Sequence, residues 1–310
     1  MSKNTRRNFL RSMAVSGMAA GVVSSKNAIA QSDAPLSPSY LSPQADKYID
    51  PRKVLLYECT RKELRERINS GQLKAAIIPT GSTEQHNEHM AMIMDAAGAL
   101  LVSQHAALKL YPQVIVTTPV AFGVSPYWMA RQGTITLREE IFTGIVYDIC
   151  CCIKTHGIDT ILIVNGHGGN REPLKKAVPD YRLKLGINIE WCQYTEAVAE
   201  EQQAAMEGKE SFLDSTVEGE HAGEIETSIC LAAFPERVHR VTYEGIEPYK
   251  WNTDKADLDR VRYYTHDVDK TPDWDKDSFE DSKLATEEKG ELIIGKATNW
   301  IADKLLKMMG

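Results

Sequence analysis

Residues 75–89 read Ala-Ala-Ile-Ile-Pro-Thr-Gly-Ser-Thr-Glu-Gln-His-Asn-Glu-His, and this stretch decides the fold that we expect. The apolar run 75–78 predicts a buried strand, and Pro79 and Gly81 end it in a turn. Open α/β sheets place their sites in loops of this kind, just past the end of a strand. The loop and the residues after it carry side-chain types that bind divalent metals: Glu84, His86, His89 and Asp95. On this stretch alone, a metal site and a polar surface loop are equally good interpretations.

Helix and strand patterns alternate along the rest of the chain. A helix is predicted to begin at Thr60, where Glu63 completes a capping box, and the first strand follows over 73–78. Further helices are predicted over 96–110, 138–156, 171–185 and 285–309, and further strands over 113–119, 159–164 and 187–194. Strand, helix and strand in succession form the unit of a parallel sheet, so the pattern predicts an α/β domain with a mostly parallel central sheet. The inner face of the last helix is expected to carry Ile293, Ile294, Trp300, Ile301, Leu305 and Leu306.

Residues 1–30 have the features of an export signal. Arg6 and Arg7 form a twin-arginine pair, an apolar run follows over 13–23, and the small-residue site Ala-Ile-Ala ends the segment at 28–30. The apolar run is too short to span a bilayer, so we expect cleavage after this site, with an uncleaved membrane anchor as the alternative. The segment therefore predicts export by the twin-arginine (Tat) machinery to the periplasm.

The charge of the mature chain excludes some classes of partner. Cleavage removes five of the 36 basic residues and none of the 43 acidic ones, which leaves a net charge of −12. A chain this acidic is not expected to bind nucleic acid or an anionic membrane surface.

The mature chain is expected to form one large domain. The four prolines of 31–52 predict an extended leader, and 53–310 then forms the domain. Within it, 250–283 mixes aromatic residues with Asp and Lys, and we interpret it as an insertion that acts as a lid or a subunit contact. A solvated surface loop is the better supported alternative for this segment.

The six cysteines are expected to be free. Cys150, Cys151, Cys152 and Cys230 lie in apolar helical runs, where free cysteine packs as a small hydrophobic residue. The sequence has no C-x-x-C pair, so neither a zinc knuckle nor a disulfide framework is predicted.

Two further polar segments carry candidate site residues. One is Asn-Gly-His-Gly-Gly-Asn at 165–170, where glycines let the backbone approach whatever His167 holds. The other holds His221 and opens a helix that contains Glu226. The positions three, four and seven residues from Glu226 are apolar, so its carboxylate is predicted to lie in the interior and to need a compensating cation. Glu224 has polar residues at these spacings and is expected to face solvent or the rim of the site.

Taken together, these segments resemble the creatininase (creatinine amidohydrolase) family. The matching motifs, in order, are Gly81-Ser82-x-Glu84-Gln85-His86-x-x-His89 with Asp95, Asn165-Gly166-His167-Gly168-Gly169-Asn170, and His221-Ala222-Gly223-x-x-Glu226-Thr227-Ser228. Gly133-Thr134 and Glu288-Lys289-Gly290 fit as well. The resemblance implies a three-layer α/β/α fold, two divalent metal ions and a homo-oligomer, in this family a hexamer. The metals would be zinc or manganese, with iron as a further candidate.

The resemblance also implies roles for individual residues. It places Glu84 and His167 on one metal and His86 on the other, with Asp95 bridging the two and Glu226 completing the set. It implies proton transfer by His221. Where creatininase has one of its carboxylate ligands, this chain has Gly169, so Glu226 as a ligand rests partly on its predicted burial.

The substrate pocket is expected to differ from that of relatives, which usually have Gly-Pro where this chain has Asn87-Glu88 and often a histidine where it has Trp128. The residues that we expect to line the pocket are Glu88, Ser125, Tyr127 and Trp128. Two adjacent aromatic residues near an acid suit a flat or ring-shaped polar substrate.

These features predict an exported dinuclear-metal hydrolase that opens a small cyclic amide, as creatinine amidohydrolase does. The nucleophile would be a metal-bound hydroxide, and His221 would carry a proton to the leaving atom. One alternative is hydrolytic ring opening of a cyclic ketone of the dehydro-inosose or keto-sugar type. Another is a non-catalytic periplasmic protein that binds a metal or a solute.

Overall fold

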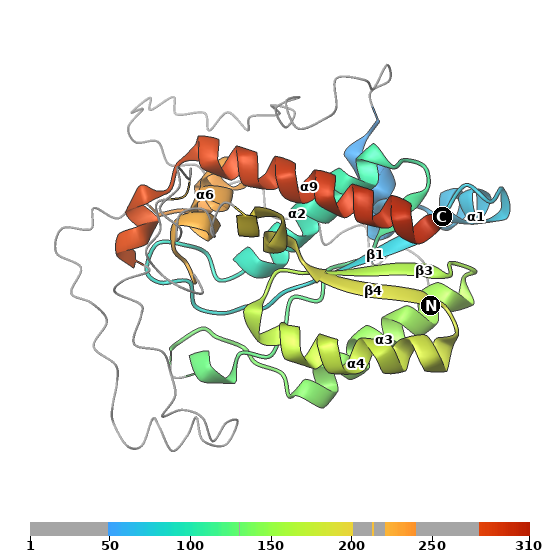
Figure 1. Cartoon of the computed structure of the whole chain (residues 1–310), viewed down its shortest axis with the longest axis horizontal. Helices are drawn as coiled ribbons and strands as arrows, with labels where there is room; N and C mark the ends of the chain where they lie inside the picture. Colours follow the sequence, from blue (N-terminus) through green and yellow to red (C-terminus); the bar gives the residue numbers. More distant parts are fainter. Residues whose placement is uncertain (1–48, 130, 201–212, 214–220, 240–278) are drawn as a thin grey trace, which may run out of the picture. The chain divides into compact units, whose positions relative to one another are not determined.

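The computed structural model describes residues 49–129, 131–200, 213, 221–239 and 279–310, which belong to one compact unit (Figure 1). The predicted signal peptide, 1–30, and most of the leader and of the segment 250–283 lie outside the described residues, so these assignments stay predictions. The described end of the leader differs from the expected extended chain. Asp50 caps a 3₁₀ helix, η2 (Pro51–Val54), and its side chain accepts a hydrogen bond from the Arg52 amide.

The central sheet is parallel, as the sequence predicts. It contains β1 (Ala75–Thr80), β2 (Val114–Val116), β3 (Thr160–Asn165) and β4 (Asn188–Gln193) in the order β2-β1-β3-β4. Ala75 pairs with Val114 on one side and with Thr160 on the other, and Thr160 pairs with Asn188. Every residue of β1 is buried, as expected for a central strand covered on both faces.

Helices cover both faces of the sheet and give the three-layer α/β/α architecture (Figure 1). One face packs against α2 (Met94–Lys109), α6 (Glu224–Ala233) and α9 (Glu287–Met309), and the other packs against α3 (Glu139–Thr155) and α4 (Arg171–Leu185). Successive strand residues point to opposite faces, so Ile77 lies in the first core and Ile78 in the second. Each fully buried isoleucine of this kind contributes about 1.5–3 kcal/mol to folding.

The remaining helices are short. α1 (Arg61–Asn69) begins with the predicted capping box, in which the side chains of Thr60 and Glu63 bond to each other's backbone amides. The other 3₁₀ helices are η3 (Leu56–Glu58), η4 (Pro126–Trp128), η5 (Gly168–Asn170), η6 (Tyr194–Val198), η7 (Pro235–Arg237) and η9 (Ser282–Leu284). Within the described part of the chain, no helix has the length and apolar character needed to cross a membrane.

Two expectations about buried side chains need correction. Leu306 was expected on the inner face of α9, but it is 48% exposed, because the helix rotates by about 100° from the fully buried Leu305 to Leu306. All six cysteines are free, as expected. Cys152 was expected to pack as a small buried residue, but it is exposed on α3, whereas Cys150, Cys192 and Cys230 are buried.

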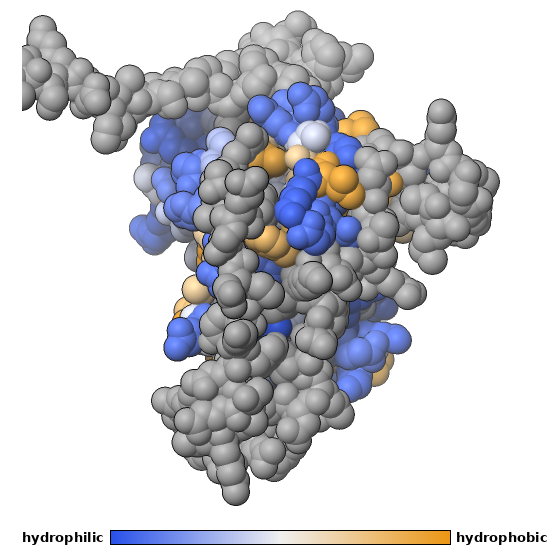
Figure 2. Space-filling view, turned by 90° about the vertical axis from the view of Figure 1, so that its left-hand side faces the viewer, coloured by the Kyte–Doolittle hydropathy of each residue, from blue (hydrophilic) through white to orange (hydrophobic). Residues whose placement is uncertain are grey.

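The strand order creates a topological switch point at the carboxyl ends of β1 and β3. The chain passes from β1 outward to β2 and then crosses back over β1 to reach β3, so the loops after β1 and β3 leave in different directions. Ligand sites of open α/β sheets lie at this switch point, at the carboxyl ends of the strands. At this point a hydrogen bond of 2.9 Å from the Thr80 hydroxyl to the Asn165 side chain joins the ends of β1 and β3. Figure 2 views the molecule from this side, where described hydrophilic and hydrophobic residues lie interspersed.

Candidate metal centre

The candidate ligands come from four separate parts of the fold. Glu84 and His86 lie in the loop after β1, Asp95 lies in the first turn of α2, His167 follows β3, and Glu226 lies in the first turn of α6. The switch point brings the first three segments together, and α6 approaches them from the side of α2 (Figure 1).

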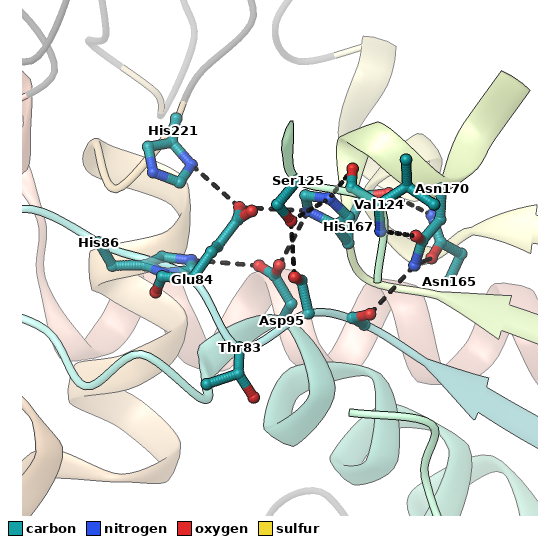
Figure 3. A network of polar contacts seen from close by, with 12 residues as sticks. Thr83, Glu84, His86, Asp95, Val124, Ser125, Asn165, His167, Asn170 and His221 are labelled. Atoms are coloured by element: carbon teal, nitrogen blue, oxygen red, sulfur yellow. Dashed lines mark hydrogen bonds and ion pairs between the residues drawn. The ribbon is translucent and has the colours of Figure 1, made fainter. Parts of the chain in front are cut away.

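Asp95 occupies the middle of the cluster (Figure 3). Its Oδ1 lies 3.1 Å from Nε2 of His86, and its Oδ2 lies 3.0 Å from Nδ1 of His167. Nδ1 of His167 is also 3.1 Å from Oε1 of Glu84, and Nε2 of His86 is 3.6 Å from Oε2 of Glu226. One carboxylate therefore touches both imidazoles, as the bridging role expected of Asp95 requires.

Backbone carbonyls orient the two imidazoles. Nδ1 of His86 lies 3.0 Å from the carbonyl oxygen of Glu84, and Nε2 of His167 lies 3.1 Å from the carbonyl oxygen of Val124. A carbonyl oxygen only accepts hydrogen bonds, so in each neutral ring the nitrogen facing it carries the hydrogen. The lone pair of the other nitrogen then points into the carboxylate cluster, which is the tautomer that a metal-binding histidine needs.

The electrostatics of the cluster favour added positive charge. Burial disfavours the charged form of His86, but the neighbouring Asp95 carboxylate outweighs this and raises the pKa of His86 to about 10. Burial also opposes protonation of His167, yet Glu84 and Asp95 raise its pKa. Burial raises the pKa of Glu226 to about 7, with His86 acting against it. Without a metal, the carboxylates are compensated by protons on the histidines. A divalent cation among these groups would take the place of those protons.

The donor set fits such a cation. Oε2 of Glu84 is buried and has no hydrogen-bond partner among the described residues. Glu84, Asp95 and His167 can present their ligand atoms within 4.8 Å of one another, and so can His86, Asp95 and Glu226. Imidazole and carboxylate together suit zinc, manganese or iron. Asp95 belongs to both groups, so the geometry fits two neighbouring cations.

His221 lies against the same cluster. Its Nδ1 is 3.7 Å from Oε1 of Glu84, and Glu84, His86 and His221 form a third group with the spacing of metal ligands. Its Nε2 lies 2.8 Å from the carbonyl oxygen and 2.9 Å from the side-chain nitrogen of Gln85. Burial and the nearby His86 lower its pKa, which favours the neutral ring. The carbonyl of Gln85 accepts from Nε2, so the lone pair of the neutral ring lies on Nδ1.

The residues expected in the pocket have different positions. Ser125 joins the cluster, with its hydroxyl 3.0 Å from Nε2 of His167. The ring of Trp128 stacks on His221 with 4.4 Å between centroids, and Tyr127 packs edge-on against Trp128. Trp128 thus contacts the expected proton carrier itself. The side chain of Glu88 is exposed, and no described contact joins it to the cluster.

The two acids at the start of α6 are arranged differently from the expectation. The side chain of Glu226 is 19% exposed, and its Oε2 accepts a hydrogen bond of 2.6 Å from the Ala222 amide. Glu224, expected at solvent or the site rim, is fully buried and pairs with Lys289. The prediction for Glu224 was wrong because the face that it shares with Ser228 is covered by the start of α9, where Lys289 pairs with Glu224 and the Thr286 amide donates to the Ser228 hydroxyl.

Several residues that support the site were not assigned this role from the sequence. Nδ2 of Asn170 donates to the carbonyl of Gly81 and to the side chain of Asn165, each at 3.1 Å, and its Oδ1 accepts from the Val124 amide. His89 bonds to the Thr227 hydroxyl at 2.9 Å and contacts the Phe279 ring, 5.7 Å between centroids. The asparagines lie in the motif around His167, but spacing alone does not reveal their partners.

Replacing Gly169 with Ala is expected to damage the centre. A Cβ there would lie 2.1 Å from the Val124 carbonyl oxygen and 2.6 Å from both Nε2 of His167 and the hydroxyl of Tyr127. The backbone must shift, so we expect a loss of about 1–3 kcal/mol of stability and weaker metal binding. Thermal unfolding and a Mn²⁺ titration measure both effects. Gly168→Ala is the matched control, because a Cβ at Gly168 meets nothing within 4 Å; equal effects of the two substitutions would contradict the expectation.

The fold and the cluster define a class of protein: an α/β/α protein with a carboxylate and histidine metal centre at the topological switch point of a parallel sheet. The family model described as creatinine amidohydrolase matches residues 57–305. The chain belongs to the creatininase family and is a hydrolase.

Individual relatives agree with this assignment. The chain is 26% identical to the creatinine amidohydrolase of Pseudomonas putida over 280 residues, covering 82% of this chain and 96% of that protein. It is 27% identical to the 3-dehydro-scyllo-inosose hydrolase of Thermotoga maritima, covering 64% of this chain and 62% of that one. It is 29% identical to a mycofactocin precursor peptide peptidase of Mycobacterium ulcerans, covering 52% and 59%.

Solved structures agree in fold. A crystal structure of creatinine amidohydrolase superimposes with a TM-score of 0.63 at 25% identity, covering 82% of this chain and 97% of that one. A manganese form of creatininase gives a TM-score of 0.60 at 26% identity, covering 82% and 98%.

Proposed function

We propose that this protein is a dinuclear-metal hydrolase that opens a small cyclic amide. The observation that carries the proposal is the position of Asp95, whose two oxygens contact His86 and His167 and which belongs to two groups of metal-binding spacing. The match to nearly the whole length of a creatinine amidohydrolase supports an amide as the substrate.

The residues that would hold the metals are those of the resemblance: Glu84, His86, Asp95, His167 and Glu226. When bound, two divalent cations lower the pKa of water and polarise a carbonyl group, which is the chemistry that amide hydrolysis needs. The three carboxylates would neutralise most of the positive charge of two divalent cations, as a buried site requires.

His221 is suited to move the proton. Its ring is neutral and its Nδ1 faces Glu84, so this nitrogen can accept a proton from the attacking water. The same proton is then passed to the amide nitrogen as the C–N bond breaks, which leaves a carboxylic acid and an amine; the acid then loses its remaining proton to solvent or to the amine. Stacking on Trp128 and the contacts to Gln85 hold the ring in one orientation during both transfers.

Hydrolytic ring opening of a cyclic ketone is the second candidate, favoured by the similarity to the inosose hydrolase. It would use the same centre, because a polarised ketone also accepts water before a C–C bond breaks. Membership of a hydrolase family favours both enzymes over the non-catalytic binding protein.

We also propose, from the signal-like segment 1–30 and the family resemblance, that the mature protein works in the periplasm as a homo-oligomer, a hexamer. Cell fractionation and mass photometry of the cleaved protein test these two points. Cytoplasmic accumulation of the uncleaved chain, or a monomer at micromolar concentration, would contradict them.

Activity and metal content together test the main proposal. Protein loaded with Mn²⁺ or Zn²⁺ is expected to hold two equivalents per chain by elemental analysis and to hydrolyse creatinine or a related lactam. A chelator should abolish turnover, and the same metal should restore it. Keto-cyclitols and short peptides complete the substrate panel, and turnover of either class alone would replace the cyclic amide with that class. A content of one equivalent in fully active protein would overturn the dinuclear centre.

A further inference from the structure

A buried ion pair joins the helix that carries Glu226 to the last helix of the chain. Glu224, the first residue of α6, is fully buried, and its Oε1 lies 2.5 Å from Nζ of Lys289 in the first turn of α9. The side chain of Lys289 is 17% exposed, and its Nζ also donates to the carbonyl of Leu284 at 3.0 Å. The pair spans 65 residues of sequence, so it fixes two distant segments relative to each other.

Backbone packing around the pair is equally close. A Cβ on Gly290 would lie 1.9 Å from the carbonyl oxygen of Ser228 and 2.8 Å from Cβ of Ala232, so α9 rests directly on the backbone of α6 at this point. The Thr286 amide donates to the Ser228 hydroxyl at 3.2 Å. Residues 286–290 thus hold α6 by an ion pair at its first residue, Glu224, and by a hydrogen bond and a backbone contact at Ser228 in the following turn.

The first turn of α6 and the residues before it constrain the position of the Glu226 side chain. Glu226 lies two residues after Glu224, and its carboxylate is tied to the Ala222 amide. Ala222 has a φ of 53°, a left-handed backbone conformation that a residue with a Cβ adopts only where its surroundings enforce it. The carboxylate that contacts His86 thus belongs to the same helix turn that Glu224 ties to α9.

We propose that Lys289 is a positioning residue of the metal centre: through Glu224 it fixes the first turn of α6 so that Glu226 reaches the cation shared with His86 and Asp95. This inference rests on the proposed role of Glu226 as a ligand. The resemblance includes Lys289 and Gly290 in a motif but assigns them no task, and neither touches the cluster in the described contacts. Residues that orient a metal ligand typically change metal affinity 10- to 100-fold when replaced.

The test compares metal binding in charge-altered variants. In Lys289→Met the second equivalent of Mn²⁺, measured by calorimetry and elemental analysis, is expected to bind roughly 10- to 100-fold more weakly, while the first binds as in wild type. Lys307→Met is the matched control, because Lys307 is exposed at the far end of the same helix. Lys289→Arg keeps the charge and is expected to restore most of the affinity.

A double variant separates positioning from general stability. Lys289→Met removes a positive charge from beside the buried Glu224 carboxylate and is expected to lower the melting temperature, whereas Glu224→Gln with Lys289→Met removes both charges of the pair and is expected to recover it. The second equivalent of Mn²⁺ should still bind weakly in the double variant. If the single variant does not fold, the metal affinity of the double variant tests the proposal instead. Wild-type affinity for both equivalents in the double variant would overturn the proposal. If the wild-type protein bound two equivalents but turned over no cyclic amide, the proposed substrate would be wrong. The comparison of metal affinities between wild type and variants would still test the role of Lys289.

Discussion

Asp95→Asn is expected to abolish activity and to release both metals. Asp95 is the residue that contacts His86 through one oxygen and His167 through the other, so a neutral amide weakens both halves of the centre at once. Bound cations supply several kcal/mol of transition-state stabilisation, which corresponds to a loss of at least about three orders of magnitude in kcat/KM. Elemental analysis after dialysis and initial rates on the cyclic substrate measure the two effects.

The control for this substitution is Asp148→Asn, which makes the same chemical change on the exposed face of α3. It should leave metal content and rate unchanged. If Asp95→Asn retained two equivalents with wild-type affinity, Asp95 would not bridge the metals, and each of the two groups would have to hold its cation without it.

His221→Asn is expected to lower kcat by roughly 10²- to 10⁴-fold while both metals remain bound. The reason is that Nδ1 of His221 lies 3.7 Å from Oε1 of Glu84, beside the proposed metal ligands, and we propose that it carries the proton to the leaving nitrogen. Asparagine keeps a polar side chain but takes up no proton at neutral pH. Single-turnover rates isolate the chemical step, and elemental analysis gives the metal content of the same sample.

Metal content decides between two roles for this histidine. His221 also belongs to a group of metal-binding spacing with Glu84 and His86. Loss of one equivalent in His221→Asn would therefore identify it as a ligand and contradict its assignment as a proton carrier. His156→Asn, an exposed histidine at the end of α3, is the matched control and should be silent in both measurements.

The sequence predicts the sheet and its edge because the signals there are local. An apolar run ended by Pro79 and Gly81, and another that runs into Asn165, are enough to place two strands and the loops that follow them. The parallel pairing of β1 and β3 then brings Glu84 and His167 together without any further information. The α/β/α class was confirmed for the same reason.

Contacts between distant helices could not be predicted in this way. Helical spacing within α6 indicated that Glu226 was the buried acid and Glu224 the exposed one, whereas the structure has Glu224 fully buried. The deciding partner, Lys289, lies on a helix that the pattern of α6 does not reveal. The stacking of Trp128 on His221 could not be predicted either, because it depends on the path of a segment that no periodicity describes. That Trp128 lines the substrate pocket stays a prediction.

The dependence of α6 on α9 has a consequence for biosynthesis. Every proposed ligand is encoded before residue 227, but the segment that holds the last of them in place follows residue 285. The ribosome therefore synthesises all the proposed ligands before it synthesises residues 286–290. Until then the nascent chain contains the ligand side chains, but Glu226 is not yet held in position. The complete two-cation centre is therefore expected only after residues 286–290 have been synthesised and have packed against α6, so the second metal is expected to bind later than the first.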